Sequence, residues 1–182
     1  FFFTSIFSDQ ILGYEAALQN IELILNILLF FSKSFFFPDS YGYNFIDLFF
    51  SNYDKYNLNC KNLGILTVNQ IINISNNDYT NIFDQNGINF LISIFPNDLN
   101  SNQIVDSLSL LYITIAQKTN LTVDTLKQFG DVLKKYIKDV LKNYNDGSDY
   151  IFENYTKFML IFLQHEPPIK EYLREFVPSF GT

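Results

Sequence analysis

A thiol and an imidazole are the first side chains in this sequence that could carry out chemistry. Cys60 and His165 could in principle act as a nucleophile and its base. They stand far apart in the sequence, in stretches whose apolar spacing predicts packed helices, and no oxyanion turn accompanies either. We therefore interpret His165, which precedes Glu166 and two prolines, as the end of a helix, where an imidazole can meet free backbone carbonyls.

Acidic side chains occur in two places where they could bind a metal ion or transfer a proton. Asp146, Ser148 and Asp149 resemble part of a calcium loop, but the twelve-residue ligand spacing and the terminal Glu are absent. A turn followed by a helix N-cap accounts for them. Glu171 and Glu175 are one helical turn apart and could pair as general acid and base, yet the interleaved basic residues favour a solvated face with local ion pairs. We expect no catalytic residue, no metal site and no cofactor.

A stripe of lysines follows the polar side of the segment from Val123 to Tyr144. Such a stripe could bind an acidic partner, and an exposed helix face accounts for it as well. Its members are Lys127, Lys134, Lys135, Lys138 and Lys142. The seven glycines are scattered, so the chain has no glycine-rich loop that could bind phosphate.

The charge of the chain argues against nucleic acid and anionic membrane as partners. Twelve basic and 19 acidic residues give a net charge of -7, and such a field repels phosphate. The same charge suits a basic partner, or serves only to keep a chain that is 48% hydrophobic in solution. The most apolar run, Leu23 to Phe31, contains Asn26 and is shorter than the roughly 20 residues that span a bilayer, so we expect no membrane insertion.

Cysteine usage indicates a reducing compartment. Cys60 is the only cysteine, which excludes an intrachain disulfide and a cysteine-based zinc site. The sequons at Asn73, Asn120 and Asn154 would argue for secretion, but a chain this rich in Asn contains such triplets by chance. The sequence starts at Phe1 rather than Met, and we expect it to be part of a longer chain.

Helical periodicity dominates the chain. Apolar residues at three- and four-residue steps predict a series of helices, each with a polar residue that can cap its start. Candidate caps are Ser8 or Asp9, Asp39 with Ser40, Asn59, Ser101 or Asn102, Thr122 and Asp149. The expected helices cover about 8–31, 41–53, 59–74, 102–117, 123–144 and 150–166, with a last short helix around 169–176.

Three segments between these helices are less regular. Tyr79 to Asp84 suits a single helical turn, and Asn86-Gly87 is a turn signal. The apolar stretch from Ile88 to Phe95 could be a hairpin strand, although no partner strand of similar quality flanks it. Gly64 lies inside the predicted helix 59–74 and weakens it by roughly 1 kcal/mol relative to Ala.

The predicted fold is all-α, and residues 1–182 form a single helical segment. Helix pairs recur about every 40 residues, which is the period of HEAT and armadillo repeats and favours an α-solenoid of antiparallel helix pairs. An irregular helical bundle remains the alternative, because the repeats share little sequence. In such a fold, the many Phe and Tyr side chains pack in the core between two helix layers.

Two blocks of this sequence resemble a known family. Between Ala16 and Ile74, the segments LILNILLFFSKSFFFP, YNFIDLFFSNY and NCKNLGILTVNQIINIS resemble consecutive HEAT repeats of the exportins, in the importin-β superfamily. There, a helix ends in an aromatic-x-Pro corner, and a helix with a Phe-rich face follows. From Tyr144 to Glu166, YNDGSDYIFENYTKFMLIFLQHE is similar to an exportin segment in which an Asp-rich turn precedes a helix. The order of the blocks fits exportins that carry leucine-rich export signals.

The resemblance implies a segment of a nuclear transport receptor that acts by binding rather than catalysis. Members of the family bind the GTP-bound form of the GTPase Ran, cargo proteins and the Phe-Gly repeats of nucleoporins, and they move between nucleus and cytoplasm. No residue of this chain matches a contact motif of the family, so no site residue is transferred.

Two other hypotheses stand beside the transport receptor: a helical scaffold or adaptor subunit of a protein complex, and an enzyme with an unfamiliar site. Repeat ends without polar caps would expose an apolar face and favour self-association.

Overall fold

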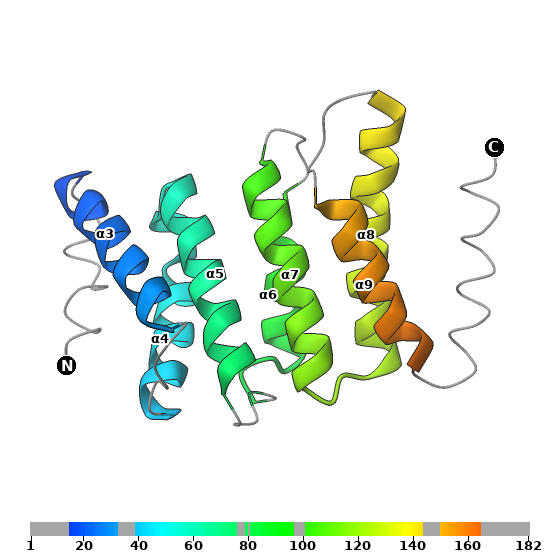
Figure 1. The fold of residues 1–182 in the computed structure, drawn as a ribbon, viewed down its shortest axis with the longest axis horizontal. Coiled ribbons are helices and arrows are strands. Elements are labelled where there is room, and N and C mark those ends of the chain that lie inside the picture. The colour runs from blue at the N-terminus through cyan, green and yellow to red at the C-terminus, as the bar shows by residue number, and fades with distance from the viewer. Residues whose placement is uncertain are drawn as a thin grey trace.

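The described part of the chain consists mainly of α-helices. The computed structural model describes residues 15–32, 39–75, 79, 81–96, 101–143 and 150–164. Within these ranges it contains helices and turns but no strand, which confirms the predicted all-α class. The α-helices are α3 (Glu15–Ser32), α4 (Asp39–Ser51), α5 (Leu58–Ile74), α6 (Gln85–Ser93), α7 (Asn102–Lys118), α8 (Val123–Asn143) and α9 (Ile151–Gln164) (Figure 1).

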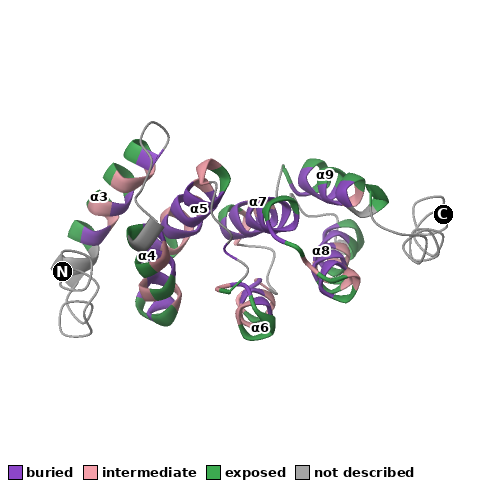
Figure 2. Cartoon of the chain, turned by 90° about the horizontal axis from the view of Figure 1, so that it is seen from below, coloured by how far each residue is buried: buried purple, intermediate pink, exposed green. Residues whose placement is uncertain are grey.

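The helices lie in two rows. In the first row α5 packs between α3 and α7, and α7 packs in turn against α9. Helices α4, α6 and α8 lie along one side of that row, and Figure 2 shows the two rows from below. The first row is the more tightly packed, whereas α4, α6 and α8 make fewer contacts with one another. The buried residues of α5 and α7 place these two helices at the centre of the molecule.

The first two helices agree with the sequence where the structure describes them. Ile21 and Leu25 of α3 are buried, as their spacing predicts. Helix α4 starts two residues before the expected Tyr41 and ends at Ser51, and a 3-10 turn over Tyr53–Lys55 follows. The expected start of the first helix at Ser8 or Asp9 and the corner before Pro38 lie outside the described residues.

The N-cap of helix α5 lies two residues earlier than the sequence suggested. The Oδ1 of Asn57, not the side chain of Asn59, accepts a hydrogen bond from the backbone N–H of Cys60 at 2.8 Å. Asn59 is an exposed residue of the first turn. Gly64 lies against Phe49 of α4, and a Cβ atom built at Gly64 would lie 2.0 Å from the Cε2 of Phe49. The glycine therefore allows α4 and α5 to approach closely, a gain that opposes its poor helix propensity.

The segment around Asn86-Gly87 is the start of a helix rather than a hairpin turn. Asp84 occupies the N-cap, and its Oδ1 accepts hydrogen bonds from the backbone N–H groups of Asn86 and Gly87 at 3.0 and 2.9 Å. The strand interpretation of Ile88 to Phe95 is wrong, because these residues form most of α6 and the turn at its C-terminal end. The apolar run is short enough to fit either a strand or a helix, and the Asp84 N-cap favours the helix.

The last three helices follow their predicted boundaries closely. Helix α7 extends one residue past Gln117, and Ser101 stands at its N-cap position without a capping hydrogen bond from its side chain. The Oγ1 of Thr122 accepts a hydrogen bond from the backbone N–H of Thr125 at 3.2 Å, as expected for the cap of α8. The Asp149 cap, the Asn145-Asp146-Gly147 turn and the short helix around 169–176 lie outside the described residues.

Tyr112 of α7 joins three helices in the core. Its ring is fully buried and stacks on that of Phe129 of α8, with the centroids 4.0 Å apart. Its hydroxyl donates a hydrogen bond to the backbone carbonyl of Leu91 in α6 at 2.9 Å. A buried aromatic side chain with its polar end satisfied contributes both apolar area and orientation. Tyr112 therefore fixes how α6, α7 and α8 meet.

Candidate functional site

The thiol that the sequence offered as a nucleophile is buried in the core. Cys60 lies in the first turn of α5 with no exposed surface. Burial raises the pKa of its thiol to about 11, and the nearby Glu22 carboxylate adds to the rise. A thiol with this pKa is protonated at neutral pH and a poor nucleophile. His165, its hypothetical partner, lies outside the described residues.

The acidic groups singled out in the sequence all lie outside the described residues. This holds for Asp146, Ser148, Asp149, Glu171 and Glu175. In the part of the chain that the structure describes, no three His, Cys, Asp or Glu side chains come together in a way that could hold a metal ion. The same part contains no helix long and apolar enough to cross a bilayer.

The lysine stripe lies on the surface of α8. Lys135, Lys138 and Lys142 are exposed, and Lys134 is half-buried. They share a shallow depression with Asp131 and Asp139 on the same helix. A mixed row of charges on one helix, in contact with solvent, fits the exposed-face interpretation better than a site for a strongly acidic partner.

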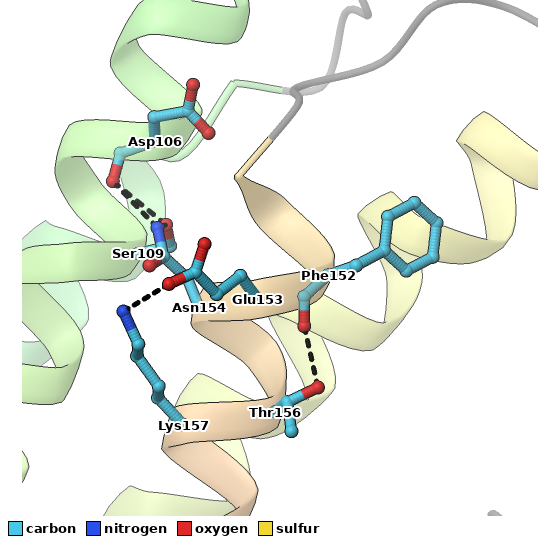
Figure 3. A network of polar contacts seen from close by, with 7 residues as sticks. All are labelled: Asp106, Ser109, Phe152, Glu153, Asn154, Thr156 and Lys157. Atoms are coloured by element: carbon cyan, nitrogen blue, oxygen red, sulfur yellow. Dashed lines mark hydrogen bonds and ion pairs between the residues drawn. The ribbon is translucent and has the colours of Figure 1, made fainter.

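The described residues do contain a polar centre, and it lies where α7 meets α9. Asn154 of α9 is only 7% exposed. Its Nδ2 donates a hydrogen bond to the Oγ of Ser109 at 2.8 Å and lies 3.5 Å from the backbone carbonyl of Asp106. The Ser109 hydroxyl donates to that same carbonyl at 2.9 Å. Figure 3 shows Asn154 reaching from α9 to both groups on α7. Because buried polar groups are costly unless paired, this network fixes the register of α9 on α7.

A second polar contact joins α7 to α5. The Ser107 hydroxyl lies within hydrogen-bond distance of the Oδ1 of Asn62 and of the backbone carbonyl of Gln103. Ser107 is buried, and Asn62 is half-buried. The Nδ2 of Asn62 and the Oδ1 of Asn154 meet no hydrogen-bonding partner among the described residues. Each amide thus holds one helix contact with one end and leaves the other end available.

These side chains line a groove of about 520 Å³ along α5, α7 and α9. That volume lies within the range of about 300–1,000 Å³ typical of ligand sites. Leu66 and Leu110 supply apolar surface, and Tyr150 contributes a ring that is 60% exposed. The remaining lining residues are Asn62, Gln103, Asp106, Ser107, Glu153, Asn154 and Lys157. The Nζ of Lys157 pairs with the Oε1 of Glu153 at 2.6 Å (Figure 3).

The groove contains none of the residues that the sequence suggested for chemistry. In the sequence, Asn154 stands out only as part of a sequon, and its burial and its hydrogen bonds explain why that triplet is no accessible acceptor. The signal that could have revealed the groove is the pair Ser107 and Ser109 inside the apolar run of α7. Small polar residues there predict a polar neighbour on the facing helix.

A second groove, of about 390 Å³, separates α4 from α6. Phe50 and Phe90 meet edge to face in its lining, with their centroids 5.6 Å apart. Asp47 and Asp54 are the charged residues of this lining, and both are exposed. The groove follows from the looser packing of this row of helices.

Comparison of the chain with protein families, with curated proteins and with solved structures found no match.

Proposed function

We propose that this chain is a protein-binding segment built as an α-solenoid of antiparallel helix pairs, of the HEAT or armadillo type. The observation that carries the proposal is the repeated placement of the helices. Each helix of the row α3, α5, α7 and α9 packs against its neighbour in the row, and α4, α6 and α8 alternate with them along the chain. Such an arrangement offers a long surface with grooves between helices, which suits the binding of proteins.

The chemistry of the described residues supports binding rather than catalysis. The one thiol is buried and protonated, and the polar side chains at the helix contacts are mostly amides and hydroxyls. Amides and hydroxyls without a neighbouring base orient ligands but do not activate them.

In its specific form, the proposal is a segment of an exportin-like nuclear transport receptor that works in the nucleus and the cytoplasm. Its support is the resemblance of two sequence blocks, of which the first corresponds to α3, α4 and α5, and the net charge of -7. The proposed partners are the GTPase Ran, a cargo protein and Phe-Gly nucleoporins. Direct binding of nucleic acid and membrane insertion form no part of the proposal.

The experiment for this form is a pull-down of the chain on immobilised Ran loaded with GTP or with GDP. Retention on the GTP form alone is the expected result. Retention on neither form, or equally on both, contradicts the transport receptor and leaves the second candidate. A second test follows a fluorescent fusion of the chain in cells, where a transport receptor is expected in both nucleus and cytoplasm.

The second candidate is a helical scaffold or adaptor subunit of a protein complex without a link to transport. A row of exposed apolar side chains on α3 favours it, with Leu23 60% and Phe30 68% exposed. A subunit of a stable assembly keeps such a surface covered, because large exposed apolar patches mark interfaces. Co-purification of the chain in a stable complex of constant stoichiometry, without Ran, would support it.

A further inference from the structure

The groove along α5, α7 and α9 presents one hydrogen-bond donor and one hydrogen-bond acceptor, each from a side-chain amide. The Nδ2 of Asn62 can donate a hydrogen bond, and the Oδ1 of Asn154 can accept one. Both amides are held in place by their other ends, Asn62 by Ser107 and Asn154 by Ser109. Oriented groups of this kind lose little conformational freedom when a ligand binds.

A donor on α5 and an acceptor on α9, the two helices that flank α7, match the main chain of an extended peptide. Every peptide unit offers one C=O and one N–H, and a side-chain amide pairs with either. Gln103, whose side chain meets no hydrogen-bonding partner among the residues that the structure describes, lies in the same lining and can supply a further donor or acceptor. A helical partner would satisfy its own main-chain groups and leave these amides without use.

The charges in the groove point to a basic side chain on that peptide. The lining contains the carboxylates of Asp106 and Glu153 against the single ammonium group of Lys157. The lining therefore has the same sign of charge as the whole chain, whose net charge is -7. Leu66, Leu110 and the exposed ring of Tyr150 add apolar surface on which the stem of a lysine or arginine can lie.

We propose that this groove binds an extended segment of a partner protein, with main-chain groups of the segment on Asn62 and Asn154 and a lysine or arginine near Asp106 and Glu153. This inference rests on the proposed protein-binding function and specifies where the partner binds and what its chemistry is. It requires neither Ran nor a transport role.

The test is selection of peptides from a random heptapeptide phage library on the purified chain. The affinities of the recovered peptides are then measured by fluorescence anisotropy. We expect peptides enriched in lysine or arginine at one position. We expect Asn62→Ala and Gln103→Ala each to weaken their binding about tenfold, since each removes a hydrogen bond to a group that is buried on binding.

Gln117→Ala is the matched control, because Gln117 is exposed on the same helix as Gln103, about 21 Å away at 1.5 Å per residue. It should leave affinity unchanged.

Glu153→Lys should abolish the preference for basic peptides, with circular dichroism showing that the helices persist. Recovery of no peptide, of peptides without basic residues, or of peptides that bind Asn62→Ala as tightly as the unmodified chain would overturn the proposal.

The outcome is independent of the Ran experiment. A partner protein that binds the unmodified chain and the Asn62→Ala and Gln103→Ala variants equally leaves the protein-binding function standing and refutes the groove. Conversely, a basic peptide bound at Asn62 supports the groove even if Ran binds in neither nucleotide state.

Discussion

At Gly64, the absence of a side chain determines how closely α4 and α5 pack. A Cβ there would lie 2.0 and 2.2 Å from two atoms of the buried Phe49 ring. We expect Gly64→Ala to lower the free energy of unfolding by about 1–3 kcal/mol, because overpacking outweighs the gain of about 1 kcal/mol in helix propensity. Urea denaturation measures the change.

The same residue pair supplies the control. In a Phe49→Leu background the smaller side chain leaves room, so Ala at position 64 should be neutral or stabilising there. Equal losses from Gly64→Ala in both backgrounds would mean that Phe49 is not the cause. If Gly64→Ala alone raised the free energy of unfolding, Gly64 would only weaken its helix, as its propensity predicts.

The buried thiol of Cys60 predicts a loss of stability at alkaline pH. Its pKa in the folded chain is about 11, whereas an unfolded chain exposes a cysteine with a pKa of about 8.5. As the pH rises, the Cys60 thiol therefore loses its proton at a lower pH in the unfolded chain than in the folded chain. The stabilising contribution is complete below about pH 8.5 and is lost as the pH rises toward 11. Urea denaturation at a series of pH values from 7 to 10 measures this slope.

Cys60→Ala isolates the thiol from other groups. Burial, followed by the nearby Asp54 carboxylate, raises the pKa of Tyr53 to about 12, so this tyrosine keeps its proton in the folded chain between pH 8.5 and 10. Between pH 8.5 and 10 we therefore expect the variant to show a smaller decline in stability than the unmodified chain. The same decline in both would remove Cys60 as its source.

At the scale of elements, the start of α5 separates two asparagines that the sequence alone could not. Asn57 accepts a hydrogen bond from the Cys60 N–H, whereas Asn59 lies exposed in the first turn. Asn57→Ala should cost about 1 kcal/mol of stability, as loss of an N-cap usually does. Asn59→Ala should change stability by less than about 0.5 kcal/mol in the same urea experiment. The reverse order would place the cap at Asn59.

The attachment of α9 to α7 depends on Asn154. Asn154→Ala removes its hydrogen bond to Ser109 in a buried contact, and we expect a loss of about 1–3 kcal/mol in urea denaturation. In a double-mutant cycle with Ser109→Ala, the second change should cost less once the first is made, with a coupling of about 1 kcal/mol. Additive losses would show that the two side chains do not stabilise each other.

Sequence reasoning predicts the helices better than the contacts between them. Helical periodicity places α7, α8 and α9 within a residue or two, because an amphipathic face repeats along the chain itself. It fails at α6, where Ile88 to Phe95 is too short for its period to exclude a strand. It also misses the use of Gly64 and the partner of Asn154, because both depend on which helix lies opposite. The groove shares this limit, since three separate helices form it.

At the scale of the whole molecule, the uneven packing of the two rows has a consequence for binding. The tightly packed row holds a groove whose amides are fixed by helix contacts, whereas the looser row holds a groove between α4 and α6 that is lined by Phe50 and Phe90 beside two exposed carboxylates. A groove built on packed helices keeps its shape when empty, so binding there loses little energy to reorganisation.

The exposed apolar face of α3 lies at one end of the row. Leu23, Ile27 and Phe30 follow one another at four- and three-residue steps and are all exposed. Contiguous apolar surface of this kind is removed from water by another protein or by another copy of the chain. We therefore expect the isolated chain to self-associate as its concentration rises. Light scattering across a concentration series measures the mean mass.

A paired substitution on α3 tests whether this face is the cause. Leu23→Glu with Phe30→Glu places two like charges on the face and should return the mean mass to that of a monomer. Leu141→Glu on α8 is the control, because Leu141 is also exposed but lies outside the α3 face. It should leave association unchanged. A chain that stays monomeric at high concentration, or one whose association survives the paired substitution, would show that the α3 face does not bind another copy.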